Sequence, residues 1–156
     1  MQFDEILKTL KTKEERILIL DEIRILTDSL YKEGDNSFES VIGKRVRKQT
    51  SDFFSGVFTN QKINKEEYFQ ALELKINEIE VLEVSLAYIP SANSISLISN
   101  WITKNLGSFL IDFKYDPTLI AGGVIIYKGK YLDLSLRKKF EDYFQENYTN
   151  LMKFLN

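Results

Sequence analysis

The apolar positions of this 156-residue chain recur with one period before residue 79 and with another after it. Before that point they are spaced three or four residues apart, which is the spacing of a helix with one buried face. After it, stretches of alternating apolar and polar residues, typical of half-buried strands, are interleaved with helical stretches. We therefore predict two parts: a helical region over residues 1–78 and a mixed module over residues 79–156.

The helical region is predicted to contain three or four helices. Thr12 and Glu15 match a capping box, in which each side chain satisfies a backbone amide at the start of a helix. Gly34 is expected to end the long helix that they open, and another helix is expected after Asn64. Residues 3–10 form either a separate first turn or the beginning of the long helix. The buried stripes are Ile19, Ile23, Leu26 and Leu30, and then Tyr68, Phe69, Leu72, Ile76 and Ile79.

Between these two, a single helix is predicted to run from about residue 38 to about residue 58. Its buried side is formed by Ile42, Val46, Phe53 and Val57. Phe54 and Phe58 fall outside this stripe. Two explanations stay open: Ser55 and Gly56 break the helix, or the two rings form a second apolar face that contacts a partner protein.

The second part is predicted to be a βαββα module with a small mixed sheet, which makes the chain α+β in class. Strands near residues 82–88 and 109–115 flank a helix that Gly107 ends, and such a crossover is right-handed with its strands parallel. A hairpin turns at Gly129, and a last helix follows. The expected core comprises Leu82, Val84, Leu86, Tyr88, Ile95, Ile98, Trp101, Ile102, Leu106, Phe109, Ile111, Phe113 and Tyr115.

The segment over residues 116–135 has the most specific local pattern in the chain. Its distinctive residues are Asp116, Gly122, Gly123, Gly129, Asp133 and Ser135. Pro117 biases the residue before it to an extended conformation, so a turn is expected there. The glycine pair permits backbone angles or close approaches that a side chain would forbid. The aspartate and the serine at the end of the segment are both suited to cap the last helix.

This pattern resembles the C-terminal end of the delta subunit of bacterial F-type ATP synthases, whose mitochondrial relative is the oligomycin-sensitivity-conferring protein. The same six residues match the family pattern, and the resemblance extends upstream through residues 82–90. It implies a non-enzymatic stator subunit without a cofactor. In the family, the helical part holds the catalytic head, including its alpha subunits, and the C-terminal part binds the b helices of the membrane sector. The helical part here is shorter than the family's six-helix bundle.

The last helix carries a second candidate partner surface. Its expected inward residues are Leu136, Phe140, Tyr143 and Phe144. Beyond Asn147, the sequence continues with Tyr148, Leu151, Phe154 and Leu155, which have no strand of this module left to cover. We therefore predict that this tail packs on another chain.

Composition narrows the possible functions. The chain has no cysteine and no histidine, which excludes disulfides and thiolate metal sites and removes the side chain best suited to proton transfer at neutral pH. No stretch has the roughly 18 apolar residues of a membrane span, so no direct membrane insertion is expected. The expected location is peripheral, on the cytoplasmic face of a bacterial membrane. The net charge of −2 gives no support to nucleic-acid binding.

One alternative function depends on a basic cluster. Lys44, Arg45, Arg47 and Lys48 follow one another closely, and a helix over residues 38–58 that binds phosphates would make the chain a nucleic-acid or ribosome-associated module. A solvated helix face is the simpler explanation, because the domain as a whole is not basic. The sequence therefore favours the peripheral-stalk function.

Overall fold

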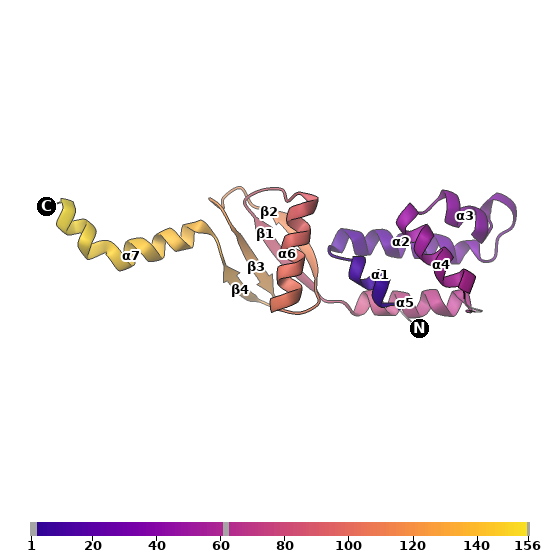
Figure 1. Cartoon of the computed structure of the whole chain (residues 1–156). Helices are drawn as coiled ribbons and strands as arrows, with labels where there is room; N and C mark the ends of the chain where they lie inside the picture. Colours follow the sequence, from indigo (N-terminus) through magenta and orange to yellow (C-terminus); the bar gives the residue numbers. More distant parts are fainter. Residues whose placement is uncertain (1–2, 61–62, 156) are drawn as a thin grey trace. The chain divides into compact units, whose positions relative to one another are not determined.

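The computed structural model describes residues 3–60 and 63–155, and gives the backbone alone for Asn60, Phe144 and residues 147–155. Its helices and its mixed sheet place the chain in the α+β class, as predicted. The chain divides into two compact units, Met1–Glu80 and Val81–Asn156, which are described separately below (Figure 1). In the described part of the chain, no helix is long and apolar enough to span a bilayer.

Among the described residues of the first unit, the regular elements are all helices. Its α-helices are α1 (Asp4–Thr9), α2 (Lys13–Ser29), α3 (Phe38–Lys44), α4 (Lys48–Asn60) and α5 (Lys65–Glu78), with a short 3-10 turn at Gly34–Asn36 (Figure 1). The capping box at Thr12 and Glu15 is present, and the Asn64 side chain caps α5. Residues 4–9 form a separate helix. The shared core consists of Ile6, Ile19, Ile23, Leu26, Phe38, Val41, Ile42, Phe54, Tyr68, Phe69, Leu72 and Ile76.

Gly34 does not end the long helix, so that prediction was wrong. Helix α2 stops at Ser29, where Leu30 is the C-cap with right-handed angles. Gly34 instead begins the 3-10 turn with a φ of +63°, a conformation that costs a side-chain-bearing residue more than glycine. A positive φ is needed here, but for a turn rather than for a helix end.

The single helix predicted over residues 38–58 is two helices, α3 and α4, with the break at residues 45–47. Ser55 and Gly56 lie inside α4 and do not interrupt it. Because of this break, the residues of α4 that face the core are not those expected for one continuous helix. Phe54 is fully buried, and Phe58 packs against the same core. Both rings contact Phe69 and Tyr68 edge to face. The proposal that Phe54 and Phe58 form a partner-binding face was therefore wrong.

The second unit contains a four-stranded sheet in the order β2-β1-β3-β4. Strands β1 (Val81–Leu86) and β2 (Leu110–Tyr115) are parallel and joined by α6 (Ala92–Asn105), as predicted. Strand β3 (Gly123–Tyr127) runs antiparallel to β1 and turns into β4 (Lys130–Asp133). Lys128 and Gly129 both have positive φ, the requirement of a two-residue type I′ hairpin turn. Helix α7 (Leu136–Leu155) follows.

Helix α6 covers one face of the sheet (Figure 1). The core under it consists of Leu82, Val84, Leu86, Ile102, Ile111 and Ile125. Four residues predicted for this core are exposed instead: Tyr88, Trp101, Leu106 and Tyr115. Tyr88 is beyond the end of β1 and exposed, and Trp101 is 47% exposed. Because Ile98 and Ile102 face the sheet directly, the intervening Trp101 falls at the edge of the buried stripe.

Candidate partner-binding sites

Five of the six motif residues gather at one end of the sheet, where the loop between β2 and β3 meets the start of α7. The backbone amides of Leu134 and Leu136 donate to the carbonyl oxygens of Gly123 and Ala121, both at 2.9 Å. A Cβ on Gly122 would lie 2.5 Å from the Leu134 carbonyl oxygen, closer than any side chain is accommodated. The glycine is therefore required so that the loop can hold the strand that leads into α7.

Two carboxylates fix the turns on either side of this junction. The Asp116 side chain accepts from the amide of Thr118 at 2.9 Å and from its hydroxyl at 2.7 Å. Asp133 accepts from the amide of Ser135 at 2.8 Å, one residue before α7. Hydrogen bonds from the side chain and the backbone amide of Thr118 lower the pKa of Asp116 below its ordinary value, and those from the side chain and the backbone amide of Ser135 do the same for Asp133. The remaining motif residue, Gly129, lies at the hairpin tip, at the opposite end of β3.

An apolar groove of about 300 Å³ lies between α6 and the neighbouring strands. Its lining consists of Leu86, Leu97, Ile98, Trp101, Ile102, Gly123, Ile125 and Leu134. Leu97 is 63% exposed and Leu134 is 45% exposed, so the groove is open to water on one side. An open groove with no charged side chain in its lining suits the apolar face of a helix.

The described part of α7 carries an exposed apolar stripe of its own. Leu136, Phe140 and Tyr143 are spaced as one helical stripe, and all three are exposed. They were predicted to face inward, and that prediction was wrong. The groove residue Leu134 stands two positions before α7 in the sequence. The side chains of the predicted tail contacts, Tyr148, Leu151, Phe154 and Leu155, lie outside the described residues.

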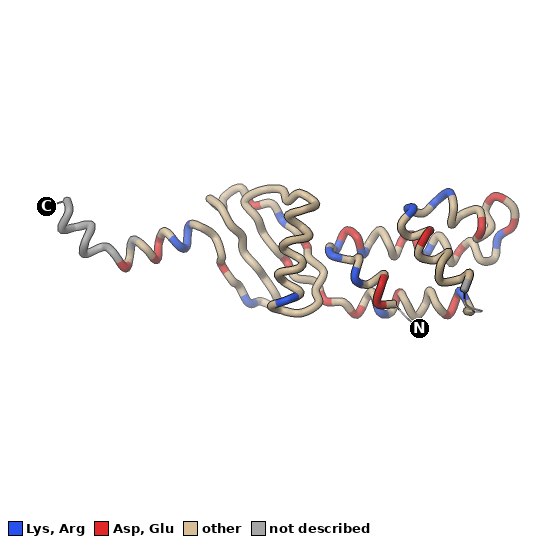
Figure 2. The backbone as a smooth tube through the Cα atoms, viewed as in Figure 1, with Lys and Arg blue, Asp and Glu red and all other residues tan. Residues whose placement is uncertain are grey.

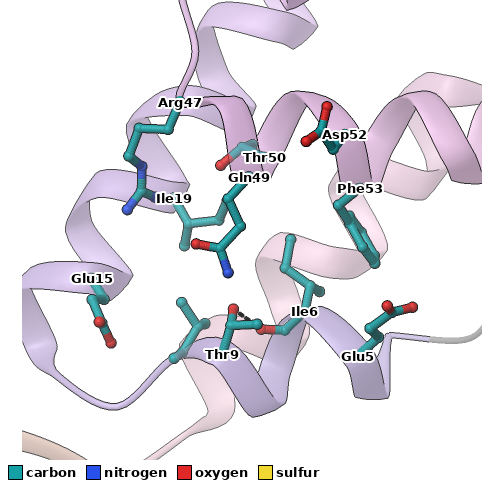
Figure 3. Close-up of a pocket in the computed structure, with 11 residues that line it drawn as sticks. Glu5, Ile6, Thr9, Glu15, Ile19, Arg47, Gln49, Thr50, Asp52 and Phe53 are labelled. Carbon is teal, nitrogen blue, oxygen red and sulfur yellow. Dashed lines mark hydrogen bonds between the residues drawn. The ribbon is translucent and has the colours of Figure 1, made fainter. Parts of the chain in front are cut away.

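The first unit has a cavity of its own, of about 360 Å³, among α1, α2 and α4 (Figure 3). Apolar side chains and acidic or polar ones both line it: Glu5, Ile6, Thr9, Leu10, Glu15, Ile19, Arg47, Gln49, Thr50, Asp52 and Phe53. Glu5 comes from α1 and Asp52 from α4, and both are exposed. The apolar residues Ile6 and Ile19 are buried at the base.

The guanidinium in this cavity is already bound. Arg47 donates through Nε and Nη2 to the two carboxylate oxygens of Glu22 at 2.8 and 2.9 Å, and the Thr50 hydroxyl donates to the same carboxylate at 2.7 Å. Burial alone would raise the pKa of Glu22, but these hydrogen bonds outweigh it and leave the pKa below its ordinary value. The hydrogen bonds that Arg47 donates to Glu22 raise the pKa of Arg47 in turn. The sequence analysis missed Glu22, although an acidic residue beside Ile19 and Ile23 on a buried stripe is a usable signal.

The predicted basic face is not a single solvated helix surface. Arg47 lies at the break between α3 and α4 and binds Glu22, while Lys44 lies 3.7 Å from Asp35 and Arg45 donates to Asn36. Basic and acidic positions are interspersed along the backbone of the first unit (Figure 2). Three of the four basic side chains thus have partners on neighbouring segments. The continuous basic helix that the nucleic-acid alternative requires is absent from this described segment.

Comparison with known proteins identifies the family. The family model of the ATP synthase delta (OSCP) subunit matches residues 3–146, which is nearly the whole chain. The chain therefore belongs to the ATP synthase delta (OSCP) subunit family, as its sequence pattern suggested. No individually curated protein matches it. Membership makes the chain a peripheral-stalk component of an F-type ATP synthase, a structural stator subunit that interacts with subunits of the head and the stalk.

Proposed function

We propose that this member of the delta (OSCP) family joins the catalytic head of an F-type ATP synthase to the b helices of the membrane sector, at the cytoplasmic face of a bacterial membrane. It would hold the head still against the rotor during proton-driven ATP synthesis. The chain would act without a cofactor, since the task is mechanical. The second unit would bind b, and the first unit would hold the head through its alpha subunits.

One observation carries this proposal: the exposed apolar surface formed by the α6 groove and the start of α7. Monomeric soluble proteins rarely expose large contiguous apolar patches unless these bind something. Trp101 lines the groove, and the ring of Phe140 is exposed on α7. Buried aromatic side chains commonly dominate the energy of protein interfaces. A helix that lies in the groove and continues along Leu136 and Phe140 would cover these side chains together.

The experiment uses Trp101, the one tryptophan of the chain, as a reporter inside the groove. A peptide of the b C-terminal helix, chosen without tryptophan, is titrated into the full chain while tryptophan emission is followed. We expect a saturable blue shift, because binding removes the indole from water. Leu97→Glu should weaken binding by at least about tenfold, since it places a charge in an apolar contact.

The matched control is Thr103→Glu, which adds the same charge to an exposed position of α6 outside the groove lining. It should bind the b peptide as the wild type does. No emission change and no binding of the b peptide by the wild type would argue against the b-binding function. Equal losses in the Leu97 and Thr103 variants would argue against the groove as its location.

A further inference from the structure

We infer that this chain pairs with a second copy of itself through the groove beside α6 and the exposed stripe of α7, which consists of Leu136, Phe140 and Tyr143. The stripe of each copy would lie in the groove of the other. This surface is the one proposed above for the b helices, so the two copies would separate when b binds. That release rests on the proposed function, whereas the pairing itself rests on the two surfaces.

The groove and the stripe have the same chemistry and complementary forms. The groove, of about 300 Å³, has no charged side chain in its lining. Leu136, Phe140 and Tyr143 follow one another at intervals of four and three residues, which places them on one face of α7. An amphipathic helix with this spacing is the form that an apolar groove accepts. Each copy therefore carries both a groove and a helix suited to fill it.

The junction before α7 explains why the helix does not fill the groove of its own chain. The backbone amide of Leu136 donates to the carbonyl oxygen of Ala121 at 2.9 Å, and Ser135 is only 2% exposed. Along the stripe the exposed fraction rises from 37% at Leu136 to 48% at Phe140 and 58% at Tyr143. A buried, hydrogen-bonded junction thus fixes the direction in which α7 leaves the sheet, and covering the groove falls to a second copy.

A two-fold axis satisfies both contacts at once. The rotation that places one α7 in the opposite groove also places the other α7 in the first groove, so association closes at two copies. Trp101, Phe140 and Tyr143 are each about half exposed, and a fully covered aromatic side chain buries about 150–250 Å². The rings of two copies therefore supply roughly 450–750 Å², a large share of the about 1,200 Å² that the smaller stable interfaces bury.

Sedimentation velocity tests the pairing on the full chain, from low to high micromolar concentration. We expect the 18.2 kDa monomer to be replaced by a species of twice that mass as the concentration rises. A monomer at every concentration would overturn the inference. Association that continues beyond two copies would also overturn it, because reciprocal exchange leaves no unfilled groove.

Two variants locate the interface. Leu97→Glu places a charge in the groove, Phe140→Glu places one in the stripe, and each should raise the dissociation constant of the dimer at least tenfold. The matched controls, Thr103→Glu and Gln145→Glu, add the same charge to exposed positions of α6 and α7 outside the groove lining and the stripe. They should pair as the wild type does. Unchanged pairing in the first two variants would overturn the inference.

A mixing experiment tests the reciprocal arrangement. Leu97→Lys and Phe140→Glu should each pair poorly alone, because both contacts of each homodimer contain an unmatched charge. A mixture of the two should pair at a concentration at which neither does alone. One contact of the mixed dimer is unaltered, and the other brings opposite charges together. If α7 covered the groove of its own chain instead, mixing would restore nothing, and that result would overturn the inference.

The outcome can be separated from that of the proposed function. The Trp101 response to the b peptide is measured at a concentration at which the chain is monomeric, and an excess of the peptide should convert the dimer into monomers. An absent dimer with an intact Trp101 response would reject the pairing and leave the b-binding function standing. A dimer that forms as described, in a chain whose Trp101 gives no response to the peptide, would do the reverse.

Discussion

Arg47 binds Glu22 across 25 residues of sequence, and this contact fixes the junction between α3 and α4. The guanidinium donates twice to the carboxylate, and the Arg47 backbone amide donates to Glu22 Oε1 at 2.8 Å. A carboxylate is thus placed at the N-terminal end of α4, where the helix dipole favours negative charge. The contact explains why a separate helix, α4, begins at Lys48. Because α4 is not a continuation of α3, a different set of its residues faces the core, and Phe54 is among them.

Glu22→Gln should destabilise the first unit. The substitution keeps the size of the side chain but removes the charge that pairs with Arg47. We expect the free energy of unfolding to fall by about 2 kcal/mol at pH 7, less than the roughly 3–5 kcal/mol of a fully buried pair because Arg47 is partly exposed. Urea denaturation measures the change. The matched control is Asp21→Asn, an exposed neighbour on α2, for which a comparable loss would contradict a specific role for the pair.

The effect of Glu22 should depend on pH in a defined direction. Its folded-state pKa is lowered, so it stabilises the fold above the ordinary glutamate pKa of about 4.3, and this contribution is lost as the pH falls toward the folded-state value. The difference in unfolding free energy between wild type and Glu22→Gln should be constant near neutral pH and shrink below about pH 4.3. A difference that stays the same down to pH 3 would show that charge is not its source.

Gly122 should tolerate substitution less well than Gly129. Both have positive φ, +81° and +76°, so alanine at either position costs about 1–2 kcal/mol in backbone strain. At Gly122 the new Cβ would also meet the Leu134 carbonyl oxygen at 2.5 Å, whereas the space around Gly129 is open. We expect Gly122→Ala to lower the denaturation midpoint clearly more than Gly129→Ala does. Equal midpoints would mean that the loop shifts freely away from α7.

Gly123 provides a separate case, because its φ is not positive. A Cβ there would lie 2.8 Å from Leu86 Cδ2 and 2.9 Å from the Ser85 carbonyl oxygen of the adjacent strand. Gly123→Val should therefore destabilise the second unit by roughly 1–3 kcal/mol through overpacking. Thermal unfolding followed by the emission of Trp101 reports on this unit directly. An unchanged midpoint would show that the strand β3 can move away from β1 without loss.

The second unit is expected to fold alone. Every strand of the part of the chain that the structure describes lies within residues 79–156, and the core of the sheet and α6 is drawn entirely from that span. A fragment of these residues should show a cooperative thermal transition and dispersed amide signals in NMR spectra. A fragment with neither property would require the helical unit for its folding.

Truncation after Glu146 tests the tail that the sequence singles out. If residues 147–156 contact the b helices, their removal should weaken binding of the b peptide by several kcal/mol, because apolar and aromatic anchors dominate such interfaces. The groove and Leu136 remain in the truncated chain, so its fold should be unaffected. Circular dichroism checks the fold, and the titration monitored by Trp101 measures the affinity. Equal affinities would assign the contact to the groove alone.

The period of the apolar residues was sufficient to predict most elements of the chain. The capping box at Thr12, the cap at Asn64, the parallel strand pair around α6 and the hairpin at Gly129 all follow from local rules and are all present. Local rules succeed here because caps and tight turns depend on residues within a few positions of one another. The family, likewise, was recognisable from the pattern over residues 116–135.

Only the tertiary structure decided where the middle helix breaks and which side chains face water. Glu22 reaches Arg47 from another helix, and no pattern within residues 38–58 contains that contact. Trp101 and Phe140 have the spacing of core residues, but the sheet is too small to cover the edge of α6 and the stripe of α7. Periodicity gives the apolar face of an element, whereas burial depends on whether another element is there to cover it.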